Sequence, residues 1–355
     1  MVNRTSQRGR DNLQQTNIEN MAVVVGVSEE RVRAIIDEKL QIALKDFSDE
    51  ANRIAQGRNE KFSEKLIDRM VKKHALDAFA DPSFQVLLVE AQKRAASSER
   101  ECDYDLLAEL MVRRFESGGD RLERAGVSKA VEIVDQVSDE ALLGLTIVHA
   151  VLQFVPMSGG ISSGLKVLND LYGKLLYAEL PVGSGWLDHL DILGAIRISA
   201  LGGVKPFEEC LIQKLPGYMV EGIEKGSEDF NRAIDKLQSV GLGDKVLIDH
   251  ELTKDRVRLA LVGEEQIRDL RVIRDGLPAR SATQEQQEAL RDVFALSNQK
   301  QISKQRVVEE IEKYPSMKLI REWWNKLENG LRITSIGQVL AHANAQRIDS
   351  TLPPL

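Results

Sequence analysis

The first proline of this 355-residue chain is Pro82, and apolar residues before it recur every three or four positions. They are Val32, Ile35, Ile36, Leu40, Leu44, Phe47, Ala51, Ile54, Phe62, Leu66 and Met70. Such spacing places one apolar stripe along a helix, and no proline interrupts it. We therefore expect either one very long helix starting after Ser28 or an antiparallel helix pair with a break near residues 56–59. The stripe needs a partner, either the rest of the chain or a second subunit.

Capping signals continue the helical pattern. Asp81 precedes Pro82, and proline suits the first position of a helix because its missing N–H has no partner to lose there. The predicted buried face of that helix consists of Phe84, Leu87, Leu88 and Ala91. Ser138 is expected to cap a strongly apolar helix that follows it. These patterns predict a mainly α, multi-helix protein with a long N-terminal amphipathic helix or helical hairpin.

Changes in composition along the chain predict four units. A polar leader covers residues 1–27, and a helical core domain covers 28–155. From residue 156 onward, Gly, Pro and Ser interrupt shorter helices, which predicts a helical domain with irregular loops over 156–282. The last unit, 283–355, contains a helix, a turn, a short strand at "LRIT" and another helix. That order is typical of a winged-helix unit.

Composition limits the classes of function. The formal net charge is -7, which argues against a nucleic-acid binder over the whole chain. Two distant cysteines, Cys102 and Cys210, cannot form a disulfide framework and indicate a reducing compartment, so we expect a cytoplasmic protein. No apolar stretch approaches the roughly 20 residues of a membrane-spanning helix.

The sequence carries one formal catalytic pattern. "GISSG" at residues 160–164 matches G-x-S-x-G, which places a nucleophilic serine, here Ser162, on a strand-to-helix turn. The preceding segments are helical, however, and the candidate partners Asp188 and His189 are adjacent in sequence. We expect a flexible Gly/Ser loop and assign no catalytic residue. A serine hydrolase at Ser162 is the third hypothesis for function, after the two given below. The histidines are far apart and no phosphate-binding loop occurs, so we expect no metal site and no cofactor.

Nucleic-acid binding, if it occurs, is expected in the C-terminal unit. The basic residues there lie around a Trp pair, and the candidate contacts are Lys304, Arg306, Lys318 and Arg321. This unit gives the alternative hypothesis of a DNA-binding regulator.

The leader is rich in Asn and Gln and contains Gly, a composition that is disordered alone but can form ladders of amide side chains between identical chains. The residues that fit this pattern are Gln7, Gly9, Asn12, Gln15, Asn17 and Ile18. The charged side chains among them would meet their own copies in a stack, which favours a small closed oligomer over a fibre. The other interpretation is a disordered tail.

The leader, together with "ADPSFQVLLVEAQKRAA" and "LRITSIGQVLA", resembles an uncharacterised family of bacterial, mostly helical proteins with an Asn/Gln/Gly N-terminal element. Similar leaders occur on effectors in conflict and phage-defence loci. Glu19 stands where the pattern has Gln. The resemblance implies a role in antiviral defence and assembly through Gln7, Gly9, Asn12, Asn17 and Ile18. We therefore expect a non-enzymatic, homo-oligomeric interaction or sensing module, with a phage component or another protein as a candidate partner.

Overall fold

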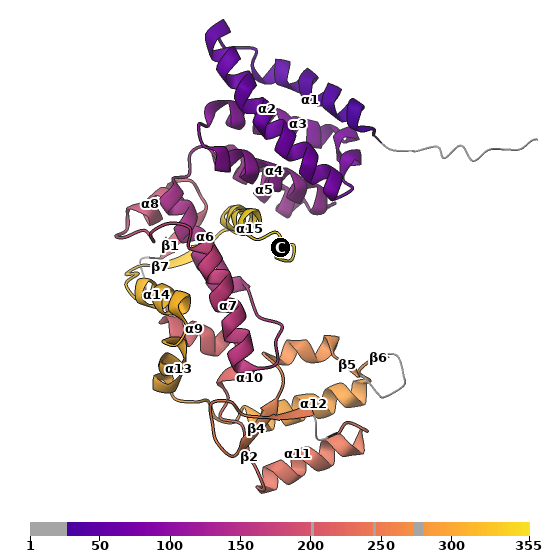
Figure 1. Ribbon diagram of the computed structural model, residues 1–355, viewed down its shortest axis with the longest axis vertical. Helices are drawn as coiled ribbons and strands as arrows, with labels where there is room; N and C mark the ends of the chain where they lie inside the picture. Colours follow the sequence, from indigo (N-terminus) through magenta and orange to yellow (C-terminus); the bar gives the residue numbers. More distant parts are fainter. Residues whose placement is uncertain (1–26, 200–201, 244–245, 273–279) are drawn as a thin grey trace, which may run out of the picture.

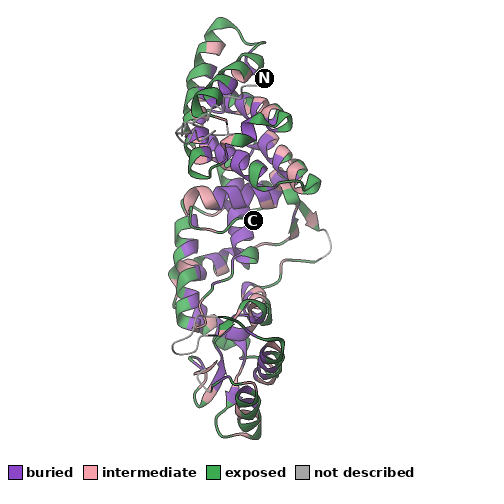
Figure 2. Ribbon diagram, turned by 90° about the vertical axis from the view of Figure 1, so that its right-hand side faces the viewer, coloured by how far each residue is buried: buried purple, intermediate pink, exposed green. Residues whose placement is uncertain are grey.

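The computed structural model describes residues 27–199, 202–243, 246–272 and 280–355. The molecule is elongated, with the N-terminal helices at one end and a small unit of helices and short strands at the other (Figure 1). It is mainly helical, as the sequence predicts. Buried residues run from the N-terminal helices into the middle of the molecule, and exposed residues cover the outer faces of the helices (Figure 2).

The N-terminal end is a bundle of helices. Its elements are α1 (Glu29–Ala43), α2 (Asp49–Lys72), η1 (Leu76–Ala80), α3 (Pro82–Ser97), α4 (Glu101–Glu116) and α5 (Arg121–Ile133). The break between the first two helices lies at residues 44–48, so the position predicted near 56–59 is wrong. Gly57 and Asn59 continue α2, where the Asn59 side chain is buried and its Nδ2 donates to Ala55 O at 3.0 Å. A single mid-helix glycine is tolerated when the flanking apolar residues pack well.

The C-terminal helix completes this bundle. α15 (Ser335–Ile348) packs against α4, α5 and α6 (Asp139–Gln153), although most of the chain separates it from α4 in sequence. A buried hydrogen bond joins the two central helices, with Asn344 Nδ2 donating to Thr146 Oγ1 at 2.9 Å. The predicted cap of α6 is confirmed, because Ser138 Oγ accepts from Ala141 N at 3.2 Å.

The middle of the molecule continues the same core. It contains α7 (Ile161–Leu175), α8 (Gly185–Ile192), β1 (Ile196–Ser199), α9 (Phe207–Lys214), α10 (Pro216–Met219), α13 (Lys304–Ile311), α14 (Pro315–Trp324) and β7 (Gly330–Ile333). The short strand predicted at "LRIT" is confirmed as β7. It pairs antiparallel with β1, in a register that places Ile196 opposite Ile333. The predicted winged-helix unit stays a prediction.

A smaller unit is inserted between α10 and α13. Its elements are β2 (Ile223–Glu224), α11 (Glu228–Ser239), β3 (Leu247–Asp249), β4 (Arg256–Leu259), η3 (Glu264–Asp269), β5 (Arg271–Val272), β6 (Arg280–Ser281) and α12 (Gln284–Ser297). One antiparallel sheet has the strand order β2-β4-β3, and β5 pairs with β6. The two segments that connect this inserted unit to the rest of the chain lie side by side. Ile302 N donates to Met219 O at 2.9 Å, and Glu221 N donates to Lys300 O at 2.7 Å.

Among the described residues, this arrangement gives two large hydrophobic cores and a small third cluster of Leu44, Ala55 and Ala96. The main core extends from Val32 to Met219 and again from Ile302 to Ala345, with Leu252 and Val262 at its edge. The core of the inserted unit lies within residues 223–294. The predicted boundary after residue 155 therefore falls inside the main core, and the one after residue 282 falls inside the core of the inserted unit.

No helix among the described residues is long and apolar enough to cross a membrane.

Candidate functional site

Helix α3 lies at the centre of the N-terminal bundle, and its start is fixed by the residues that the sequence indicates. Asp81 Oδ1 accepts hydrogen bonds from Ser83 N at 2.6 Å and Phe84 N at 3.0 Å, and Pro82 occupies the first helical turn. The Ser83 hydroxyl and these amides hold the pKa of Asp81 below its ordinary value. The predicted cap is confirmed, and it fixes where α3 begins.

The inward face of α3 is the predicted one. Phe84, Leu87, Leu88 and Ala91 are all buried. α3 packs against the neighbouring helices α1, α2, α4 and α5. A buried hydrogen bond from Gln92 Nε2 to Ile36 O, at 3.0 Å, holds α1 against α3.

The outward face of α3 is also apolar, and the sequence reasoning missed it. Val86 is 73% exposed, which is high for a large apolar side chain. The signal was present in "QVLLVE", because four consecutive apolar residues cannot all lie on one face of a helix.

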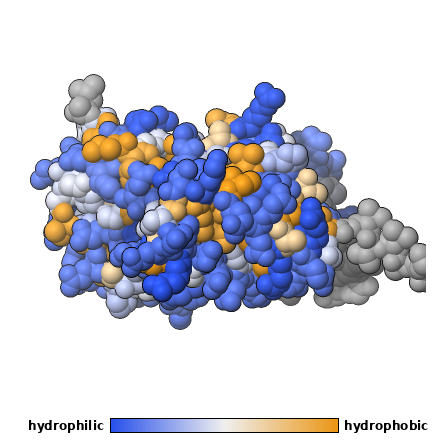
Figure 3. All heavy atoms as spheres, turned by 90° about the horizontal axis from the view of Figure 1, so that it is seen from above, coloured by the Kyte–Doolittle hydropathy of each residue, from blue (hydrophilic) through white to orange (hydrophobic). Residues whose placement is uncertain are grey.

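This outward face lies in a groove of about 650 Å³ between α1 and α5. The residues that line the groove, which we call the α3 groove, are Lys39, Ile42, Pro82, Ser83, Gln85, Val86, Leu87, Val89, Glu90, Lys93, Ser128 and Glu132. Ile42 on α1 is 53% exposed, so apolar surface comes from two helices. At the end of the molecule formed by the N-terminal helices, apolar groups alternate with hydrophilic ones (Figure 3).

Charges of both signs surround the apolar part of the α3 groove. Lys39 and Lys93 are basic, and Glu90 and Glu132 are acidic. Glu90 accepts from Arg94 Nη2 at 2.6 Å, and this pair, one turn apart on α3, lies partly exposed to solvent. An apolar centre with a polar rim is the usual anatomy of a protein–protein interface.

The apolar stripe of the first 70 residues finds most of its contacts inside the chain. Val32, Ile35 and Ile36 of α1 and Phe62, Leu66 and Met70 of α2 are buried, whereas Phe47 and Ile54 near the break are exposed. The sequence left two partners open for this stripe, the rest of the chain and a second subunit. The rest of the chain therefore covers the larger part of the stripe. The predicted assembly residues Gln7, Gly9, Asn12, Asn17 and Ile18 lie outside the described residues.

The candidate nucleic-acid contacts lie on or next to α13 and α14, and three of the four are in ion pairs. These pairs join Lys304 to Glu209, Lys318 to Glu312, and Arg321 to both Glu208 and Glu312, with N–O distances of 2.5 to 3.4 Å. The glutamates come from α9 and from the end of α13. Each pairing offsets a positive charge that a phosphate would otherwise meet.

The "GISSG" segment begins α7, with Gly160 at the N-cap. The Glu251 carboxylate accepts hydrogen bonds from Ile161 N at 2.6 Å and Ser162 N at 2.8 Å. Burial alone would raise the pKa of Glu251, but hydrogen bonds from the Ser162 hydroxyl and these amides lower it below its ordinary value. A carboxylate held in its charged form at a helix N-terminus is a cap and a weak base for activating a hydroxyl.

The other residues of the serine-hydrolase hypothesis lie on α8. His189 Nε2 is 3.1 Å from Gln136 O and 3.3 Å from Ser138 N, so the ring is held at the end of the α5–α6 connection. Asp188 is exposed. Within the described ranges, no three His, Cys, Asp or Glu side chains lie together in a way that could hold a metal ion.

Comparisons with known proteins show the family to which the chain belongs. No curated protein and no solved structure matches the chain. A protein-family model with the description ":-like" matches residues 26–352, from the first helix through α15. That range includes the main core, the inserted unit and the α3 groove, and it leaves out the predicted assembly residues of the leader. The chain therefore belongs to the family described as ":-like".

Proposed function

We propose that this protein is a non-enzymatic interaction or sensing module that assembles with a second copy of itself through the α3 groove. The observation that carries the proposal is the exposure of Val86, in a groove that also contains Ile42 of α1. Isolated exposed apolar residues are common, but two from different helices in one groove are typical of a binding surface.

The rim of the groove supports a second copy as the occupant. In a two-fold symmetric dimer, the same patch on both subunits must complement itself. A rim with two lysines and two glutamates meets that requirement, because Lys39 or Lys93 of one subunit can face Glu90 or Glu132 of the other. These four side chains are paired within the chain, so assembly would exchange those ion pairs for pairs between subunits. A rim of a single sign would repel its own copy.

Light scattering on the full chain at increasing concentration tests this assembly. We expect a mass of at least two chains for the natural protein and a single chain for Val86→Glu, because a charge in the apolar centre would lose its hydration on assembly. The matched control is Val182→Glu, since Val182 is 90% exposed and lies outside the groove. A single-chain mass for the natural protein, or an unchanged mass for Val86→Glu, would overturn the proposal.

The role of the leader in assembly is a separate part of the proposal. A chain without residues 1–20 should form smaller assemblies if Gln7, Gly9, Asn12, Asn17 and Ile18 join subunits. An assembly that is lost on this truncation but kept in Val86→Glu would assign it to the leader and remove the α3 groove. An assembly that is kept on truncation and lost in Val86→Glu would assign it to the α3 groove and remove the leader.

The place of this assembly in bacterial antiviral defence rests on the resemblance of the leader and of the α3 segment to proteins of phage-defence loci. Phage plating on bacteria that produce the protein tests it. We expect protection from the natural chain and from Val182→Glu, and loss of protection with Val86→Glu. Equal plating with and without the natural chain, over a panel of phages, would contradict the defence role while leaving the assembly intact.

The alternative, a DNA-binding regulator, has weaker support because Lys304, Lys318 and Arg321 are in ion pairs with glutamates. Fluorescence anisotropy with labelled duplex DNA over a salt series would test it. Binding that weakens steeply with salt, and that Arg306→Ala reduces, would favour it over the interaction module. No binding at low salt would remove it.

A further inference from the structure

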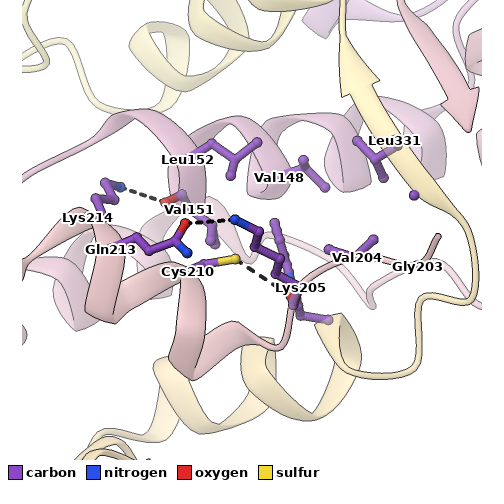
Figure 4. A pocket seen from close by; sticks show the side chains of 12 residues that line it. Val148, Val151, Leu152, Gly203, Val204, Lys205, Cys210, Gln213, Lys214 and Leu331 are labelled. Carbon is purple, nitrogen blue, oxygen red and sulfur yellow. Dashed lines mark hydrogen bonds between the residues drawn. The ribbon is translucent and has the colours of Figure 1, made fainter. Parts of the chain in front are cut away.

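A pocket of about 520 Å³ lies in the middle of the molecule, well apart in sequence from the α3 groove. It is bounded by α6, the segment that leads into α9, α9 itself and the start of β7 (Figure 4). The lining residues are Val148, Val151, Leu152, Gly203, Val204, Lys205, Cys210, Gln213, Lys214, Trp324, Gly330 and Leu331. Its volume is within the range of pockets that bind small molecules.

Most of the wall is apolar, and the polar groups converge from one side. Val148, Val151 and Leu152 project from α6, and Leu331 comes from β7 (Figure 4). Gln213 and Lys214 at the end of α9 lie opposite the end of α6. An apolar wall with a few placed polar groups is the usual composition of a ligand site.

Lys214 is a buried amine that carries only a partial charge near neutral pH. Its Nζ donates to Val151 O at 2.6 Å and to Ala150 O at 3.3 Å, two carbonyls in the last turn of α6. No carboxylate of the described residues forms an ion pair with it, and burial lowers its pKa to about 7. An ammonium group has three N–H donors, so the two carbonyls leave one for a further acceptor.

Lys205 supplies a second cation at the edge of the same pocket. Its Nζ donates to Gln213 Oε1 at 3.1 Å, and its carbonyl accepts from Cys210 Sγ at 3.6 Å. Lys205 is exposed, so its ammonium group can turn toward a ligand. Burial raises the pKa of the Cys210 thiol, which therefore stays neutral and adds no negative charge.

The charge of the lining is therefore of one sign. The twelve residues include two lysines and no Asp or Glu. Apolar walls reduce the local dielectric, so a positive charge on either lysine acts more strongly on an anion than it would in water. A bound anion in turn favours the protonated form of Lys214.

We propose that this pocket binds a small organic anion with an apolar tail, such as a monocarboxylate of medium chain length, with the carboxylate at Lys214 and Lys205 and the tail against α6. The carboxylate would accept from the free donor of Lys214 and supply its missing counter-charge. The tail would cover Val148, Leu152 and Leu331. This site goes beyond the proposed assembly, because it gives the protein a small-molecule ligand. Binding of that ligand does not depend on the assembly.

Titration calorimetry with sodium decanoate on the full chain tests the site. We expect saturable binding with one decanoate per chain, and binding of 1-decanol that is weaker by about tenfold or more, because the alcohol keeps the tail and lacks the charge. Equal affinities for decanoate and decanol would overturn the charge argument. The absence of saturable decanoate binding would overturn the site.

Variants locate the binding within the pocket. Lys214→Met should reduce decanoate affinity by about tenfold or more, and Lys205→Gln should reduce it by a smaller factor. Lys166→Met is the matched control, because it removes one positive charge from the exposed face of α7. Unchanged affinity in both Lys214→Met and Lys205→Gln would overturn the proposal.

A second kind of variant keeps the test valid if Lys214→Met fails to fold, since Lys214 also satisfies carbonyls of α6. Leu152 is 42% exposed at the edge of the pocket, so Leu152→Trp should fill the space and leave both lysines in place. We expect this variant to fold and to lose decanoate binding. Full binding by a folded Leu152→Trp chain would place decanoate elsewhere and contradict the proposed site.

Discussion

Arg258 on β4 donates a hydrogen bond from Nη2 to the carbonyl of Gly159 at 2.6 Å, and this contact joins the inserted unit to the loop before α7. The Arg258 side chain is only 1% exposed. Its guanidinium lies 5.4 Å from the ring centroid of Tyr218 and 3.9 Å from the Glu251 carboxylate. One arginine therefore connects the two cores through a loop, an aromatic ring and the carboxylate that caps α7.

Replacement of Arg258 should destabilise both units together. We expect Arg258→Met to lower the free energy of unfolding by about 3 to 5 kcal/mol, because it leaves Glu251 and the Gly159 carbonyl without their buried partner. Urea unfolding followed by circular dichroism measures this loss. Arg232→Met on α11 is the control, since the Arg232–Asp229 pair is exposed and should contribute less than about 1 kcal/mol. Similar losses for the two variants would contradict a linking role for Arg258.

Replacement of two helical glycines by alanine should change the free energy of unfolding in opposite directions. A Cβ at Gly164 would overlap the hydroxyl of Tyr218, which donates to Ser158 O, whereas a Cβ at Gly57 on α2 would meet no atom within 4 Å. Gly164→Ala should lower the free energy of unfolding by about 1 to 3 kcal/mol through overpacking. Gly57→Ala should raise it by about 0.5 to 1 kcal/mol through helix propensity. Thermal unfolding of both variants checks the signs, and a neutral Gly164→Ala would show that Tyr218 can move aside.

Local signals in the sequence predicted local structure well. The cap at Asp81 depends on atoms two and three residues away, and the cap at Ser138 depends on Ala141, so a short window contains the whole interaction. The inward face of α3 follows from the helical period alone. The predicted break between α1 and α2 is wrong because the apolar spacing is interrupted at residues 56–59, while packing of α2 against α3 and α4 keeps this segment helical.

Contacts between distant segments could not be predicted from short windows of sequence. β1 is a strand because its backbone pairs with β7, with Ile196 opposite Ile333, and no short window of sequence contains both strands. α15 joins the N-terminal bundle for the same reason. The α3 groove could be predicted only in part. The run of apolar residues at Val86 is local in sequence, but the exposure of Val86 depends on where α1 and α5 lie.

The pair His149 and His342 has a defined protonation state. His342 Nε2 lies 2.9 Å from Pro353 O, and a carbonyl only accepts, so Nε2 carries the proton. His342 Nδ1 must then accept from His149 Nε2, at 3.1 Å. His149 Nδ1 is left as a buried acceptor without a partner among the described residues. Both rings are neutral in this arrangement.

Acid should therefore destabilise the fold through His149. Burial, followed by the nearby His342 and Lys214, lowers the pKa of His149 to about 3 from an ordinary value of 6.5. The unfolded chain binds a proton as the pH falls below 6.5, and the folded chain does not until about pH 3, so stability present above pH 6.5 is lost progressively over that interval. At pH 5 the loss should be about 2 kcal/mol relative to neutral pH, at about 1.4 kcal/mol per pH unit.

The variant His149→Gln separates this titration from the hydrogen bond. Its amide can donate to His342 Nδ1 but binds no proton in this range. We expect the fall in unfolding free energy between pH 7.5 and 5 to be about 2 kcal/mol smaller in His149→Gln than in the natural chain, as measured by urea unfolding at each pH. His74→Asn is the control, because His74 is exposed and its positive φ suits asparagine. If His149→Gln kept the full pH dependence, other groups would be responsible for the acid sensitivity, and the buried pair would hold the C-terminal segment through hydrogen bonds alone.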